Sequence, residues 1–83
     1  MIIHYGTVQW KSADDGGRNN IPIGPTYGGV TYINDNAYSI FINLFPLEDG
    51  LNKFEFITEP PAVPNELTLF EGHKNVGTIY VQR

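Results

Sequence analysis

Runs of β-type residues in this chain are short, and turn-forming residues interrupt each of them. Val, Ile, Thr, Tyr and Phe dominate the runs, while Gly, Pro, Asn and Asp recur between them. This spacing is typical of an all-β protein. No stretch shows the periodicity of a long amphipathic helix. The 83 residues are therefore expected to form a single all-β domain over residues 1–83.

Six strands are expected, each bounded by a recognisable break. They cover residues 2–10, 26–33, 38–45, 53–58, 67–71 and 75–82. In the third of them, Tyr38, Ile40 and Ile42 share one face, and Ser39 and Asn43 lie on the other. Closure of a sheet removes the exposed edges that invite aggregation. The pattern therefore predicts a small six-stranded antiparallel β-barrel.

The breaks predict particular turns. Asn34-Asp35-Asn36 is a turn triplet, because Asn and Asp tolerate a left-handed backbone, and Gly50 is expected at positive φ. The Gly28-Gly29 pair inside the second strand predicts a bulge or a sharp bend. Three prolines between residues 59 and 64 remove three backbone donors, so this segment is expected to cross the barrel unpaired.

The charge balance argues against one class of partner. Nine acidic and five basic residues give a net charge of −4. The basic residues are scattered along the chain: Lys11, Arg18, Lys53, Lys74 and Arg83. Nonspecific binding to nucleic acid or to an anionic membrane needs clustered Lys and Arg. An acidic surface instead suits a basic protein partner, or serves solubility alone.

Few residues have the pattern of a catalytic or metal site. The chain has no cysteine, and therefore no thiolate nucleophile, thiolate ligand or disulfide. His4 and His73 have no acidic residues at metal-ligand spacing. Asp14 and Asp15 are adjacent, so their carboxylates are expected to point apart and to form a turn. We expect a protein that is not an enzyme and holds no metal and no cofactor.

The start of the chain carries no positively charged stretch of the kind that opens a signal peptide. No apolar run approaches the roughly 20 residues of a membrane-spanning helix. Together with the absence of cysteine, these features lead us to expect a cytoplasmic protein that does not bind membranes.

Two separated motifs give a family resemblance. Asp14-Asp15-Gly16-Gly17-Arg18 precedes a proline-containing stretch and an aromatic strand. This order resembles the opening of the third domain of elongation factor Tu, where an acidic pair precedes Gly-Gly-Arg-His. Phe70-Glu71-Gly72-His73-Lys74-Asn75-Val76-Gly77 is similar to the closing hairpin of that domain, Arg-Glu-Gly-Gly-Arg-Thr-Val-Gly. Residues 48–61 also resemble its turn, apolar strand and following proline.

The resemblance spans roughly residues 6 to 82 and implies the β-barrel fold of that domain. In the full factor, the domain helps to hold the acceptor and T stems of aminoacyl-tRNA. Arg18, Glu71 and Gly72 match positions used there, whereas Asn19 and Phe70 stand where the family has histidine and arginine. The chain has no P-loop, so no nucleotide is expected to bind.

Together, the charge, the motifs and the resemblance predict a small non-enzymatic binding protein that recognises a protein partner through loops at one end of the barrel. Phe70 is expected to be an exposed apolar side chain. The residues expected to contact the partner are Gly17, Arg18, Phe70, Glu71, Gly72 and Lys74. Two alternatives stay open: an RNA-binding module that retains part of a tRNA-stem surface, and an acidic immunity or inhibitor protein directed against a basic toxin.

Overall fold

The computed structural model describes residues 2–18 and 20–83 and contains six β-strands. Each strand begins and ends within two residues of its expected bounds. A short 3₁₀ turn, η1 (Ala13–Asp15), follows the first strand and is not predicted by the sequence pattern. The strands are β1 (His4–Trp10), β2 (Thr26–Ile33), β3 (Asn36–Asn43), β4 (Asn52–Phe56), β5 (Glu66–Glu71) and β6 (Lys74–Val81).

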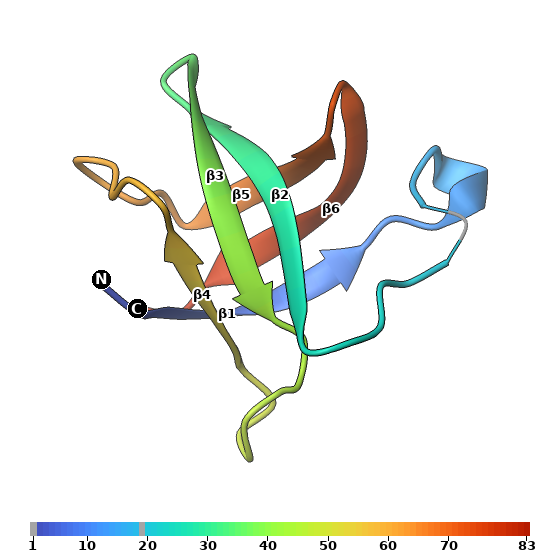
Figure 1. The fold of residues 1–83 in the computed structure, drawn as a ribbon, viewed down its shortest axis with the longest axis horizontal. Coiled ribbons are helices and arrows are strands. Elements are labelled where there is room, and N and C mark those ends of the chain that lie inside the picture. The colour runs from blue at the N-terminus through green and yellow to red at the C-terminus, as the bar shows by residue number, and fades with distance from the viewer. Residues whose placement is uncertain (1, 19) are drawn as a thin grey trace.

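The strands form a closed barrel in the order β1-β4-β3-β2-β5-β6, and every neighbouring pair is antiparallel (Figure 1). The predicted all-β, six-stranded antiparallel barrel is therefore confirmed. The ladders differ greatly in length. β2 and β3 pair along their whole length, whereas β2 and β5 are joined by the single registered pair Val30 and Phe70. The barrel is closed, but its β2–β5 seam is short.

The inward faces of the strands form one apolar core. Ile40 and Ile42 of β3 and Phe54 and Phe56 of β4 are almost completely buried, as their alternation predicts. Burial of each such side chain stabilises the fold by about 1.5–3 kcal/mol. The remaining buried apolar residues come from β2, β5 and β6: Tyr27, Ile33, Leu67, Leu69, Val76 and Ile79.

The predicted turns are present, but the predicted bulge in β2 is not. Asn34 and Asp35 have φ of 51° and 67° and close the β2–β3 hairpin, and Gly50 has φ of 83°. The β2–β3 register runs without interruption past Gly28-Gly29, so, of the bulge or sharp bend expected there, the bulge was wrong. The glycines serve a different purpose: a Cβ on Gly28 would lie 3.1 Å from Cε1 of Phe41, which stands directly opposite on β3.

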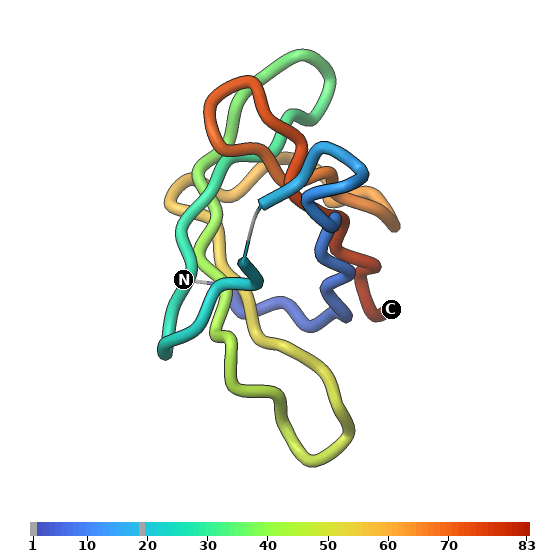
Figure 2. The backbone as a smooth tube through the Cα atoms, turned by 90° about the vertical axis from the view of Figure 1, so that its right-hand side faces the viewer, coloured from blue at the N-terminus to red at the C-terminus, as the bar shows by residue number. Residues whose placement is uncertain are grey.

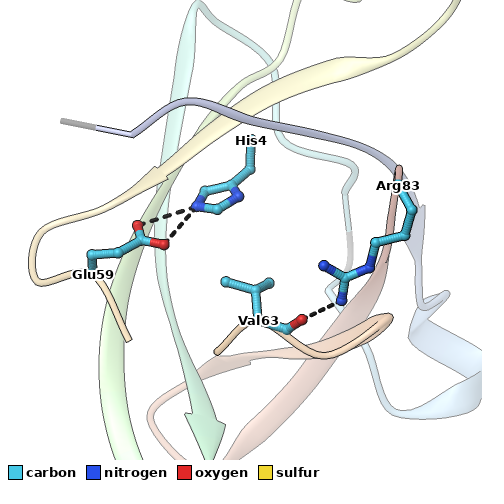
Figure 3. A network of polar contacts seen from close by, with 4 residues as sticks. All are labelled: His4, Glu59, Val63 and Arg83. Atoms are coloured by element: carbon cyan, nitrogen blue, oxygen red, sulfur yellow. Dashed lines mark hydrogen bonds and ion pairs between the residues drawn. The ribbon is translucent and has the colours of Figure 1, made fainter. Parts of the chain in front are cut away.

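The proline-rich segment, residues 59–64, crosses one side of the barrel outside any strand, as expected. Both chain ends lie on this side (Figure 1). Side chains hold the segment in place (Figure 3). Nε2 of His4 lies 2.9 Å from a carboxylate oxygen of Glu59. Arg83 donates to the carbonyl oxygen of Val63 and, at 2.8 Å, to the side-chain oxygen of Asn65. The β1–β2 loop lies on the opposite side of the barrel (Figure 1).

Candidate functional site

The loop between β1 and β2 is anchored to the barrel by its backbone. The amide of Lys11 donates to the carbonyl of Val76 at 2.9 Å, and the amide of Gly17 donates to the carbonyl of Ser12 at 2.7 Å. Gly16 ends η1 with φ of 87°. Gly17 is buried, and a Cβ there would lie 2.0 Å from the carbonyl oxygen of Lys11. Gly17, predicted as a contact residue, therefore sets the path of the loop and presents no surface of its own.

Arg18 ties the loop to the β5–β6 hairpin. Its Nη1 donates to a carboxylate oxygen of Glu71, and its Nε donates to the carbonyl of Asn20 at 3.1 Å. The guanidinium also lies 5.7 Å from the centre of the Tyr27 ring, within range of a cation–π contact. The view from the η1 side shows the loop beside the tip of the hairpin (Figure 2). The two segments predicted to lie together are thus in direct contact through Arg18 and Glu71.

Tyr27 completes this Arg18–Glu71–Tyr27 cluster from inside the barrel. Its phenol hydroxyl donates to the same oxygen of Glu71 that Arg18 contacts. The ring is buried and packs edge-on against Trp10, with centroids 5.0 Å apart. Arg18 and Glu71 were both expected among the contact residues, but no local pattern identified Tyr27 as the group that joins them.

The contacts within the cluster fix the protonation states of its three side chains at neutral pH. The hydrogen bond from Tyr27, followed by that from Arg18, holds the pKa of the Glu71 carboxyl below its usual range. Burial, together with the hydrogen bond to Glu71, raises the pKa of the Tyr27 phenol. The hydrogen bond to Glu71 also raises the pKa of Arg18. At neutral pH the cluster is therefore a carboxylate between a guanidinium and a neutral phenol.

Phe70 does not stand free, so the expectation of an exposed apolar side chain there was wrong. Its side chain is half-buried and meets Tyr32 edge-on at a centroid distance of 5.3 Å. Its backbone pairs with Val30 across the β2–β5 seam. The packing partner comes from a strand distant in sequence, which local patterns do not show. Gly72 and Lys74, at and beside the hairpin turn, are exposed as the prediction requires.

The most exposed apolar residues near the cluster were not predicted as site residues. Ile21 is 67% exposed and Ile23 is 93% exposed. With Arg18 and Tyr27 they line a hollow of about 610 Å³. A signal for them exists in the sequence, because Pro22 stands between them and Pro25 follows them, and these prolines keep the apolar stretch from joining a strand.

A second hollow, of about 330 Å³, lies on the outer face of β2. Gly28 and Gly29 line it without side chains, and Phe41, Ile57 and Phe70 line it with apolar ones. Phe41 and Ile57 are both exposed. Glu71 of the cluster borders this hollow, and Arg18 borders the first one, so the ion pair stands next to both.

Among residues 2–18 and 20–83, no three His, Asp or Glu side chains gather in a way that could hold a metal ion. The same part of the chain contains no helix long and apolar enough to cross a membrane. Comparisons with protein families, curated proteins and solved structures gave no match for this chain. The site is therefore interpreted from its geometry, which presents apolar side chains from an anchored loop.

Proposed function

We propose that this chain is a small non-enzymatic binding protein that recognises a protein partner through one end of its barrel. The surface, called the barrel-end surface below, consists of Arg18, Ile21 and Ile23 of the β1–β2 loop with Gly72 and Lys74 of the hairpin. The observation that supports the proposal best is the exposure of Ile21 and Ile23, at 67% and 93%, on a loop that Arg18 ties to Glu71.

The energetics of recognition favour this surface. Apolar side chains that stand together and are rimmed by polar groups are typical of protein-binding sites. The hydrogen bonds of Arg18 to Glu71 and to Asn20 restrict the loop before any partner arrives. A loop that is already ordered loses less conformational entropy on binding, so more of the interaction energy appears as affinity.

Charge favours a basic partner. The chain carries a net charge of −4, and Asp14 and Asp15 stand exposed in η1, which is part of the β1–β2 loop. This net charge attracts a basic protein electrostatically and speeds the encounter, while the barrel-end surface itself carries Lys74 and an Arg18 that is neutralised by Glu71. A basic toxin held by an acidic immunity protein is one pairing of this kind. In the alternative RNA-binding module, Arg18 would have to neutralise phosphate while it is paired with Glu71. We propose that the protein acts in the cytoplasm, in line with its lack of cysteine.

The experiment is capture from a lysate of the source cell at physiological salt, using tagged wild-type protein and the Ile21→Ser/Ile23→Ser double variant. Phe45→Ser is the matched control, because Phe45 is 64% exposed in the β3–β4 loop. We expect a stoichiometric protein that the control retains and the double variant loses. Equal capture by the double variant would refute this surface. Recovery of tRNA-sized RNA without a protein would favour the RNA-binding alternative.

A further inference from the structure

The two edges of β2 are used very differently. The two-residue turn makes Ile33 and Asn36 a hydrogen-bonded pair, so alternate residues of β2 bond to β3 and those between them face away. The amide of Leu44 donates to the carbonyl of Pro25 at 2.9 Å. Pro25, two residues before Tyr27, therefore also faces β3, in agreement with this alternation. Tyr27 and Gly29 therefore bond to β3, while Thr26 and Gly28 direct their N–H and C=O groups to the other edge.

In the described part of the chain, that other edge has no registered partner near its beginning, where Glu71 and Gly72 of the β5–β6 hairpin border the same hollow as Gly28. β5 contributes one registered pair there, Val30 with Phe70, and ends at Glu71. Within residues 2–18 and 20–83, no registered strand pair reaches Thr26 or Gly28 from this side, and neither residue forms a backbone hydrogen bond with a turn or loop. Gly28 is exposed. An edge of this kind offers unpaired donors and acceptors to another extended chain.

Space lies beside the open edge as well. Thr26 and Tyr27 border the hollow of about 610 Å³, and Gly28 and Gly29 border the hollow of about 330 Å³. Because Gly28 has no side chain, the second hollow reaches the backbone itself. Phe41 lines it from the neighbouring strand and Phe70 lines it from β5. This second hollow can accommodate an apolar side chain that projects from a strand paired to this edge.

We propose that the Thr26–Gly28 edge of β2 accepts an extended, basic segment of the partner protein as an added β-strand. Main-chain hydrogen bonds to Gly28 would supply affinity, and an apolar side chain in the hollow over Gly28 would supply selectivity. The inference rests on the proposed function and specifies how the partner is held. The net charge of −4 favours a basic segment and opposes pairing with a second copy of this chain.

Hydrogen exchange of the free protein tests the open edge. The amides of Tyr27 and Gly29 bond to β3 and should exchange slowly, while those of Thr26 and Gly28 should exchange at least about tenfold faster in NMR spectra. Equal protection of Gly28 and Gly29 in a monomer would overturn the inference. A dimer in sedimentation with a protected Gly28 amide would overturn it in favour of pairing between two copies.

Binding is tested with random dodecapeptides displayed on phage and selected against the immobilised full chain. We expect enriched peptides to be basic, with alternating apolar residues, and to slow exchange of the Gly28 amide. Gly28→Leu fills the hollow and should raise the Kd of such peptides by at least about tenfold. Phe41→Ser opens the wall of the hollow at an exposed position and should also weaken binding. Ala37→Leu, exposed elsewhere on β3, is the control.

Failure to enrich peptides, or equal affinity in Gly28→Leu and the control, would refute the added strand. Capture of the lysate partner separates this inference from the proposed function. If Ile21→Ser/Ile23→Ser loses the partner and both Gly28→Leu and Phe41→Ser retain it, the barrel-end surface stands and the added strand is wrong. Loss of the partner in Gly28→Leu, with retention by Ala37→Leu, supports the added strand.

Discussion

The hydroxyl of Thr31 offers a sharp test of the packing inside the barrel. Thr31 lies on β2 and is completely buried, and among the described residues its Oγ1 has no hydrogen-bond partner. Leaving a buried polar group unpaired costs about 1–3 kcal/mol. Valine has nearly the same shape as threonine, so Thr31→Val removes the unpaired group without creating a cavity.

The expected gain follows from this penalty. We expect the free energy of unfolding of Thr31→Val to exceed that of the wild type by about 1–3 kcal/mol. In a domain of this size, each kcal/mol raises the Tm by about 4–8 °C. Both residues are β-branched, so strand propensity changes little and contributes little to the difference.

Urea unfolding followed by circular dichroism measures the effect as a shift of the midpoint at constant slope. Thr7→Val is the matched control, since Thr7 is exposed on β1 and its replacement should change stability by no more than about 0.5 kcal/mol. A Thr31→Val protein that is less stable than the wild type would contradict an unpaired Thr31 hydroxyl. It would mean that the hydroxyl is satisfied in the folded protein.

Further predictions concern the Arg18–Glu71–Tyr27 cluster and the loop it holds. The lowered pKa of Glu71 contributes stability at pH values above the usual carboxyl pKa of about 4.3, and this stability is lost as the pH falls through the folded pKa. In Glu71→Gln, the free energy of unfolding measured in urea should therefore decline less as the pH is lowered. The raised pKa of Tyr27 makes stability decline as the pH rises above about 10. Tyr27→Phe should reduce that alkaline decline, and an unchanged decline would contradict the assignment. Gly17→Ala places a methyl group against the Lys11 carbonyl and should cost about 2 kcal/mol in thermal unfolding, whereas a neutral effect would mean that the loop moves freely.

The parts of the fold that the sequence predicts are those governed by local patterns. Alternation at Ile40 and Ile42 follows from the two-residue period of a strand, and both residues are buried as expected. Asn34 and Asp35 occupy the left-handed turn because of their own chemistry. These signals suffice for strand positions, and closure of the sheet follows from their number and length.

The site depends on contacts between distant residues, and there the sequence was a weaker guide. Phe70 was expected in solvent, but it packs against Tyr32 because the β2–β5 seam brings them together. The Gly28-Gly29 pair is ambiguous in sequence, since a glycine in a strand can mark a bulge or a close approach. Only the cross-strand position of Phe41 distinguishes the two.

Binding of a protein partner at the barrel-end surface would slow hydrogen exchange of the backbone amides there. The most direct test of this binding is a hydrogen-exchange footprint of the full chain, measured alone and with the partner captured from the lysate. We expect slower exchange in residues 20–29 and 70–74, with no change in the proline-rich segment, residues 59–64, on the opposite side of the barrel (Figure 1). A footprint confined to residues 59–64 and the chain ends would contradict binding at the barrel-end surface.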